Sequence, residues 1–190
     1  MLEDKQIIKL CKSGYIDMLE ILIDRHKDSL YKFCYHLSQN KLDADDLFQD
    51  TWVRTMQSIA SCDEERAFSN WLLSIALNAY RDRYRKTKRW LNKLTDFFSN
   101  EEKEAALHNA PSHAPPSDEQ AVDNELREHL VHCINLLDDT FRIPVILFYF
   151  KQMRYEDIAE ILDIPVGTVK SRLNSGKSKL RKLMEVEYFE

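Results

Sequence analysis

Glycine is scarce in this sequence, and its scarcity argues against a fold built from β-strands. Only three glycines occur among the 190 residues, namely Gly14, Gly167 and Gly176. Tight hairpins depend on glycine, above all in Asn-Gly and Asp-Gly pairs, and neither pair occurs in the chain. We therefore expect an all-α protein.

Long apolar runs are absent as well. The longest, residues 143–150, contains Pro144 and is far shorter than the roughly 20 residues that a bilayer-spanning helix requires. The amino-terminal residues MLEDKQIIKL lack the basic and then apolar pattern of an export signal. With 44% hydrophobic and 31% charged residues, the composition is typical of a soluble globular protein, which we expect in the cytoplasm.

The chain has few cysteines, and their spacing suggests no disulfide framework. They are Cys11, Cys34, Cys62 and Cys133. Scattered thiols of this kind are expected to be buried or idle in a reducing cytosol. His129 and His132 precede Cys133 at helical spacing, but a closed zinc site needs a fourth ligand and none lies nearby on the same helix. We expect neither a metal nor another cofactor.

Sequence motifs of common enzyme classes are missing too. The chain has no Gly-rich phosphate loop, no nucleophile elbow and no His-Glu-x-x-His zinc motif. Its carboxylates gather in charged stretches rather than among apolar residues. We therefore expect no catalytic residue and no small-molecule substrate.

Residues 155–181, which read YEDIAEILDIPVGTVKSRLNSGKSKLR, have the pattern of a helix-turn-helix. Apolar residues at helical spacing mark the first helix. Pro165 favours a break before it and suits the first turn of the next helix. In that second helix Val169, Leu173 and Leu180 recur at spacings of four and seven, so we expect them to face the partner helix.

The second helix of this pattern is strongly basic. Residues 165–183 include six basic residues and no acidic one, although the net charge of the whole chain is −5. The six are Lys170, Arg172, Lys177, Lys179, Arg181 and Lys182. A basic second helix after a tight turn is suited to the major groove of DNA.

Another basic stretch lies in the amino-terminal half. Residues 76–94 include seven basic residues and one acid, interleaved with Tyr80, Tyr84 and Trp90. Cations follow a phosphate backbone and aromatic rings stack on unpaired bases, so this helix is suited to single-stranded nucleic acid. A solvated charged face with inward-pointing tyrosines is the alternative for an isolated basic helix. The separate helix-turn-helix favours the nucleic-acid interpretation.

The helix expected over residues 44–59 has the opposite charge. Asp43 is a suitable N-cap, and Asp45 and Asp46 lie in the first turn, where the helix dipole favours anions. Capping does not account for a fourth aspartate, Asp50. An acidic face repels DNA and suits a basic or apolar protein surface, which indicates a protein partner.

Composition divides the chain into two helical domains. Helices are expected in the first domain over residues 3–13, 17–38, 44–59 and 65–90, and Gly14 is a natural left-handed cap for the first of them. That domain spans residues 1–94. Residues 95–122 contain three prolines and six acidic residues against one lysine, which predicts a flexible acidic linker. The second domain, residues 123–190, begins with a helix that has Leu130 on its core face. Pro144 predicts a late start or a mild kink in the next helix.

Taken together, the chain resembles the extracytoplasmic-function (ECF) group of bacterial RNA polymerase sigma factors. Residues 43–57, DADDLFQDTWVRTMQ, are similar to that family's core-polymerase-binding helix. Residues 68–86, FSNWLLSIALNAYRDRYRK, resemble its promoter-melting helix. Residues 164–173, IPVGTVKSRL, match one of its most specific signatures. The three motifs follow the family's order and spacing, and the resemblance covers nearly the whole chain.

The resemblance implies a role for each domain. The first would dock on the clamp helices of the largest polymerase subunit and open the minus-ten element. The second would read the minus-thirty-five element as duplex. The implied core-polymerase contacts are Asp46, Leu47, Gln49 and Asp50. The implied minus-ten contacts are Asn78, Arg81, Arg83, Tyr84, Arg85 and Lys86. The implied minus-thirty-five contacts are Thr168, Lys170, Ser171, Arg172, Ser175 and Lys177.

The sequence departs from the family pattern at three places, one of which is Asp163, where the family commonly has Gly. Arg154 stands where the family usually has Ser or Thr, so the helix starting at Tyr155 is expected to lack its N-cap. Glu156 and Asp157 are expected to compensate in part through the helix dipole. Residues 175–177, Ser-Gly-Lys, replace a more basic triplet, which removes one cation from the expected groove surface.

The resemblance also implies partners. The protein would join core RNA polymerase as a promoter-specificity subunit, not as an enzyme. An anti-sigma factor, often membrane-anchored in this family, would hold it inactive. The alternative is a stand-alone helix-turn-helix regulator whose first domain serves sensing or dimerisation. That alternative requires symmetric half-site binding without polymerase, and it gives no reason for a basic aromatic helix in the first domain.

Overall fold

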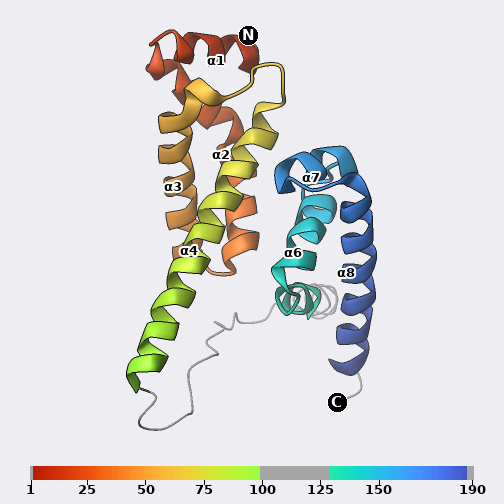
Figure 1. The fold of residues 1–190 in the computed structure, drawn as a ribbon. Coiled ribbons are helices and arrows are strands. Elements are labelled where there is room, and N and C mark those ends of the chain that lie inside the picture. Colours follow the sequence, from red (N-terminus) through yellow and green to blue (C-terminus); the bar gives the residue numbers. More distant parts are fainter. Residues whose placement is uncertain (1, 99–128, 188–190) are drawn as a thin grey trace, which may run out of the picture.

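The computed structural model describes residues 2–98 and 129–187, with side chains described up to residue 86 in the first segment and residue 185 in the second. Every regular element in these two segments is a helix, which confirms the all-α prediction. The helices form two groups, α1–α4 and α6–α8, that lie side by side (Figure 1). The expected linker, apart from its first four residues, lies outside the described residues together with residues 123–128.

Four helices form the first domain. They are α1 (Asp4–Lys12), α2 (Leu19–Ser38), α3 (Lys41–Ser58) and α4 (Phe68–Phe98), with 3-10 turns at Ile16–Met18 and Ile59–Ser61. α3 packs against both α2 and α4, and α2 also packs against α4. Phe33, Leu47 and Leu77 are fully buried at the centre of this group. No described helix is long and apolar enough to cross a membrane.

The ends of α1 follow the sequence prediction, whereas the start of α3 does not. Gly14 has φ +102° after α1, as expected for a left-handed cap. Asn40, rather than Asp43, is the N-cap of α3, because its Oδ1 accepts a 2.9 Å hydrogen bond from the Asp43 backbone N–H. α3 therefore begins at Lys41, and Asp43 lies in its first turn.

α4 differs from its predicted bounds at both ends. It starts at Phe68 instead of residue 65 and continues to Phe98, beyond the expected end at residue 90. Hence the first four residues of the segment 95–122 are helical. Figure 1 shows α4 running along the whole length of the first domain. One straight element thus carries both the domain core and the basic stretch.

The second domain contains the predicted helix-turn-helix. Residues 129–135 are helical, followed by α6 (Asp139–Val145), a π-helical turn (Ile146–Phe150), α7 (Tyr155–Leu162) and α8 (Val166–Glu187). Asp163 ends α7 in the left-handed conformation, with φ 53°. The carbonyl of Pro165 accepts hydrogen bonds from the N–H groups of Thr168 and Val169. The proline therefore lies directly before α8, one position ahead of the first turn in which the sequence placed it.

Two expectations for this domain are corrected. α6 starts at Asp139, so Pro144 does not delay it; instead the π-helical turn follows the proline directly. Proline lacks the backbone N–H that would bond to the carbonyl of residue 140, but α6 continues through it to Val145. Leu130 is 36% exposed, and Ile134 is buried in the core instead.

Gly176 lies where α8 approaches α6 closely. A Cβ built at this position would lie 3.1 Å from Cγ2 of Val145 and 3.5 Å from Cβ of Phe141. A Cβ here would require the Val145 side chain to move by a few tenths of an ångström, and a larger, branched side chain would crowd both neighbours further. The glycine sets the spacing on which the packing of the helix-turn-helix depends.

Candidate polymerase and nucleic-acid interfaces

The acidic face of α3 is the first candidate interface. Asp46 and Gln49 are exposed and Asp50 is half-buried, one turn apart on the same side of the helix. Leu47, the fourth residue assigned by resemblance, is completely buried in the domain core. It offers no surface to a partner, and its contribution is to hold α3 in place.

Ion pairs join this acidic face to α4. Nη1 of Arg83 lies 3.5 Å from Oδ2 of Asp46, and its Nε lies 4.0 Å from Oδ2 of Asp50. Arg54 bridges the helices by contacting Asp50 at 3.2 Å and Asp82 at 2.8 Å. The hydrogen bond from Arg54 lowers the pKa of Asp82. Arg83 is therefore paired with carboxylates of α3, although the resemblance assigned it to the DNA strand together with Arg81 and Arg85.

The remaining described candidates on α4 form a second surface. Asn78, Arg85 and Lys86 are exposed, and Tyr84 has 57% of its surface accessible. Arg81 is half-buried, and burial, followed by the neighbouring charges of Arg85 and Arg172, lowers the pKa of its guanidinium. The side chains of Lys88, Arg89, Trp90 and Lys93 lie outside the described residues.

The candidate minus-thirty-five residues lie along α8. Lys170, Ser171, Ser175 and Lys177 are exposed, whereas Thr168 and Arg172 are half-buried. The Ser171 hydroxyl donates a 2.9 Å hydrogen bond to the Thr168 carbonyl, and the Lys170 ammonium lies 5.6 Å from the Tyr155 ring centroid. These local contacts hold the start of α8 and leave its basic groups accessible.

The start of α7 lacks a side-chain cap, as the departure at Arg154 predicts. Arg154 instead contacts Asp157 in the first turn, with Nε 3.0 Å from Oδ2. This hydrogen bond is the largest cause of the lowered pKa of Asp157. A carboxylate in the first turn also interacts favourably with the helix dipole.

A buried arginine connects the two domains, and the motif search did not single it out. Arg142 of α6 is 2% exposed, and its Nη2 donates hydrogen bonds of 2.7 Å to the Tyr80 hydroxyl and 2.6 Å to Oδ1 of Asp139. Its Nη1 donates to the carbonyls of His36 at 3.2 Å and Leu37 at 3.1 Å. We call Arg142, Tyr80 and Asp139 the buried latch. The available sequence signal was a single arginine between Phe141 and the apolar run 143–150. A charge in such a place predicts burial, and a buried charge almost always has a partner.

Burial also changes the phenol of this latch. It raises the pKa of Tyr80 to about 12, and the positive charge of Arg142 opposes that rise only in part. Tyr80 is therefore a neutral hydrogen-bonding group here, and its ring packs against the core rather than facing a nucleic acid. Of the two tyrosines described in the basic stretch, Tyr84 alone is exposed.

A second polar cluster joins α7 to the start of α4. The amide of Asn70, itself 6% exposed, donates hydrogen bonds to Asp157 at 3.0 Å and Glu160 at 3.2 Å. Nη1 of Arg66 lies 3.0 Å from Oε1 of Glu160. We call Arg66, Asn70, Asp157 and Glu160 the surface latch. The first helix of the helix-turn-helix thus covers the beginning of the helix that carries the basic stretch.

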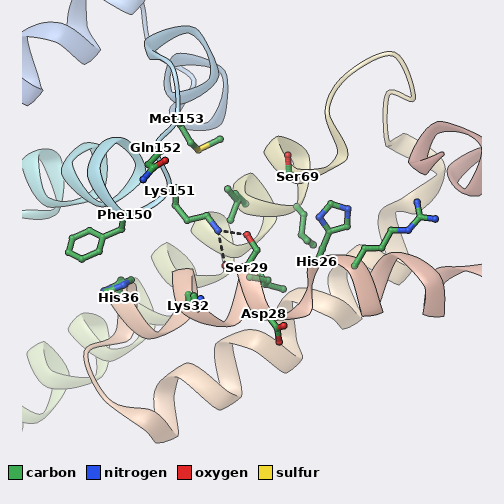
Figure 2. Close-up of a pocket in the computed structure, with 14 residues that line it drawn as sticks. His26, Asp28, Ser29, Lys32, His36, Ser69, Phe150, Lys151, Gln152 and Met153 are labelled. Atoms are coloured by element: carbon green, nitrogen blue, oxygen red, sulfur yellow. Dashed lines mark hydrogen bonds between the residues drawn. The ribbon is translucent and has the colours of Figure 1, made fainter. Parts of the chain in front are cut away.

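An open cavity of about 850 Å³ lies beside these contacts, between α2, α4 and residues 150–153 (Figure 2). The ammonium of Lys151 reaches across it to the carbonyl of Ser29, at 2.9 Å, and to the hydroxyl of the same residue. Burial lowers the pKa of Lys151, and the charge of Lys32 lowers it further. His26 and His36 line the same cavity from α2. The cavity is a gap at the domain boundary, bridged by one lysine.

The cysteines lie in the protein interior. All four are reduced and buried, as predicted. Burial raises the pKa of Cys34 to about 12 and that of Cys62 to about 11, which makes both thiols poor nucleophiles at neutral pH. Within the described segments, no group of three or more His, Cys, Asp or Glu side chains is arranged to hold a metal ion.

Comparison with known proteins identifies both domains. The family described as Sigma-70 region 2 matches residues 22–90, and Sigma-70, region 4 matches residues 127–180. The chain is 34% identical over 183 residues to the ECF RNA polymerase sigma factor SigW of Bacillus subtilis, which covers 94% of this chain and 95% of that protein.

Two solved structures show the same fold. The sigma factor RpoE from Bartonella quintana, solved with the anti-sigma factor NepR, matches with a TM-score of 0.66 and 25% identity, covering 88% of this chain and 97% of that one. CnrH, solved with the cytosolic domain of CnrY, matches with a TM-score of 0.67 and 23% identity, covering 96% of this chain and 97% of that one.

The two matched regions define a sigma-70-type transcription factor, with one domain for each region. The chain belongs to the ECF family of RNA polymerase sigma factors, because it is similar to SigW over nearly its full length. This family directs transcription initiation and is not a family of enzymes. The stand-alone helix-turn-helix regulator is accordingly not favoured.

Proposed function

We propose that this sigma factor docks on core RNA polymerase through the exposed acidic face of α3, opens the minus-ten element with α4 and reads the minus-thirty-five duplex with α8. The observation that carries this proposal is the segregation of exposed charge. Asp46 and Gln49 present an acidic, polar face on α3, whereas Arg85 on α4 and Lys170 and Lys177 on α8 present cations. Opposite charges on separate elements suit a protein partner at one and phosphates at the others.

For the minus-ten strand, the contacts we propose are Asn78, Arg81, Tyr84, Arg85 and Lys86. The exposed ring of Tyr84 can stack on an unpaired base, which is worth about 1–3 kcal/mol per base. Arg83 serves the junction with α3 instead, since it is already paired with Asp46 and Asp50. Its role is to position α4 against the polymerase-binding face.

For the minus-thirty-five element, the contacts we propose are Thr168, Lys170, Ser171, Arg172, Ser175 and Lys177. Arginine reads guanine by a bidentate hydrogen bond, and lysine supplies a point charge for phosphate. Arg172 is the arginine among these contacts, and it is half-buried whereas Lys170 and Lys177 are exposed; it is therefore our candidate for base recognition.

We further propose an anti-sigma partner, a cytoplasmic location and no catalytic role. RpoE, which shares this fold, was solved with the anti-sigma factor NepR, and this observation supports the proposed partner. We assign residues 1–94 and 123–190 to the two functional domains and residues 95–122 to the linker, consistent with family matches that end at residue 90 and resume at residue 127.

Run-off transcription with purified core RNA polymerase and a pool of promoter fragments tests the proposed function. We expect transcripts that depend on this protein and come from a subset of the fragments. Transcription that is unchanged by the protein, together with tight duplex binding in the absence of polymerase, would contradict it. The selected fragments would also reveal both promoter elements.

A further inference from the structure

The cavity beside α2 is a concave surface that the proposed promoter and polymerase contacts leave unused. Its volume of about 850 Å³ lies within the roughly 300–1,000 Å³ that is typical of small-molecule sites. Side chains of α2 and α4 form one wall, and residues 150–153 form the other (Figure 2). None of its lining residues is among the contacts proposed on α3, α4 or α8. Transcription initiation therefore does not explain this cavity.

Two lysines give the cavity its charge. Lys32 lines it from α2, and Lys151 enters it from the opposite wall. The charge of Lys32 contributes to the lowered pKa of Lys151, so the two ammonium groups are near each other. Among the described residues that line the cavity, Asp28 is the one carboxylate, and it is exposed. Within the described part of the chain, neither lysine has a carboxylate at ion-pair distance.

Other basic groups of the cavity already have partners. Arg25 and His26 each lie 2.7 Å from a carboxylate oxygen of Asp4. Lys151 differs from them, because its hydrogen-bond acceptors are the neutral carbonyl and hydroxyl of Ser29. Lys151 is also half-buried, and a charge withdrawn from water is costly unless an opposite charge compensates it. An anion between the two lysines would supply that charge.

Phosphate is the anion that this arrangement suits. A lysine ammonium is a point charge with three rotatable donors, which fits a phosphate group, and a phosphate monoester carries about −1.5 to −2 charges at pH 7. The hydroxyl of Ser69 and the amide of Gln152 are further polar groups of the cavity. Phe150, which is 40% exposed, offers an aromatic ring at the same wall. Such a ring can stack on a planar base.

We propose that this cavity binds a small phosphorylated ligand of nucleotide size, with its phosphates between Lys32 and Lys151 and its base against Phe150. The inference goes beyond the proposed function and does not depend on it. A DNA strand is the other source of phosphate. The concave shape favours the small molecule, because a duplex meets its contacts on convex, exposed helices.

Methionine-methyl NMR on the full chain shows where a ligand binds. Met153 lines the cavity, whereas Met56 is 48% exposed on α3, and Met153→Leu assigns the first of these resonances. ATP, tripolyphosphate and adenosine are titrated separately without divalent cations. We expect ATP to shift the Met153 resonance to saturation and to leave Met56 unchanged. No shift at Met153, or equal shifts at both residues, would overturn the proposal.

The two simpler probes divide the ligand into its parts. We expect tripolyphosphate to shift the Met153 resonance with lower affinity than ATP, because it lacks the base. Adenosine should bind more weakly than either, since it lacks the phosphates. Adenosine binding as tightly as ATP would overturn the assignment of the lysines to phosphate. Tripolyphosphate binding as tightly as ATP would overturn the contact with Phe150.

Substitutions test the two lysines separately. We expect Lys32→Gln and Lys151→Gln each to raise the Kd for ATP roughly tenfold, the effect of one charge-assisted hydrogen bond. Ser29→Asp places a carboxylate beside Lys151 and should weaken ATP binding at least as much. Lys27→Gln, at an exposed position of α2 outside the cavity, is the matched control and should leave the Kd unchanged. An unchanged Kd in both lysine variants of the cavity would overturn the proposal.

Thermal unfolding without ligand checks that these variants remain folded. Lys32 is exposed, so Lys32→Gln should unfold at the same temperature as the unchanged protein. Its loss of ATP binding then reports the site even if Lys151→Gln is less stable.

A short DNA duplex distinguishes the two sources of phosphate. We expect the duplex to leave the Met153 resonance unshifted and not to displace bound ATP, because its contacts lie on other helices. A duplex that shifts Met153, displaces ATP and loses affinity in Lys32→Gln would overturn the proposal in favour of a DNA-backbone contact.

Discussion

The guanidinium of Arg83 lies 3.5 Å from the carboxylate of Asp46, so a cation on the proposed promoter-melting helix is paired with an anion on the proposed polymerase-binding face. The pair is surface-exposed, with 67% of the Asp46 side chain accessible, and exposed pairs contribute only about 0–1 kcal/mol to stability. Asp46 is therefore able to exchange Arg83 for a basic group on a partner. Such an exchange would couple polymerase docking to the position of α4.

Asp46→Lys should accordingly weaken polymerase binding strongly without unfolding the protein. A like charge placed in a complementary interface costs several kcal/mol, so we expect the Kd for core RNA polymerase to rise by at least about tenfold. The free energy of unfolding should fall by no more than about 1 kcal/mol. Asp24→Lys, an equal charge change at an exposed position of α2, is the control. Equal affinities for the two variants would remove α3 from the proposed interface.

Tyr84→Ala should impair promoter opening more than duplex binding. A base that loses its stacking partner loses about 1–3 kcal/mol of binding energy, and only an unpaired base can stack in this way. We expect open-complex formation to fall roughly tenfold or more on a duplex promoter, with little loss on the binding step that precedes it. Tyr84→Phe keeps the ring and should retain activity. A defect of the same size on a premelted template and on duplex would contradict a role in opening.

Arg172→Ala should relax sequence preference at one promoter position. If the guanidinium contacts a base edge, its loss costs about 1–3 kcal/mol on the preferred sequence and much less on others. Affinities of the polymerase complex for a set of single-base promoter variants measure this difference. Lys177→Ala, at an exposed position suited to phosphate, should weaken all sequences about equally. An equal loss for every sequence in Arg172→Ala would make it a phosphate contact as well.

The residues that sequence alone placed well are those governed by local rules. Pro165 and the apolar spacing around Val169 fixed the helix-turn-helix, and Gly14 marked the end of α1. The N-cap of α3 was misplaced because Asn40 and Asp43 are equally good capping residues by type, and only the backbone geometry separates them. Leu47 and Arg83 were assigned to surfaces by resemblance, yet burial and ion pairing depend on neighbouring helices that no local pattern specifies.

The domain contacts were the part of the structure least accessible to sequence analysis. Arg142 and Tyr80 are 62 positions apart, and Asn70 and Asp157 are 87 positions apart. Each residue has an ordinary role in its own helix, and nothing in the spacing of either helix predicts its partner. Only the isolated charge of Arg142 within an apolar run pointed to burial.

The burial of Tyr80 should be measurable by its ionisation. Its pKa is raised to about 12 in the folded protein, whereas an unperturbed tyrosine has a pKa of about 10. The folded protein therefore favours the neutral phenol. Its contribution to the free energy of unfolding is complete below about pH 10 and is lost as the pH rises toward about 12. Tyrosinate absorbance of the unchanged protein minus that of Tyr80→Phe isolates this phenol among the eight tyrosines. In denaturant the same difference should titrate near pH 10; a native value near pH 10 would mean that Tyr80 is not buried.

Gly176→Val should destabilise the second domain through the spacing of α6 and α8. The added Cβ alone lies 3.1 Å from Val145, and the two further methyl groups must enter the same contact, so we expect a loss of about 1–3 kcal/mol in the free energy of unfolding. Gly176→Ala should be closer to neutral, because alanine gains up to about 1 kcal/mol in helix propensity and offsets the tighter contact. Gly167→Val is the matched control on the same helix, where an added Cβ meets no atom within 4 Å. Urea unfolding of the three variants separates the packing effect from the effect of helix propensity. Equal free energies of unfolding for the two valine variants would contradict the packing effect, because α6 would then shift without an energetic penalty.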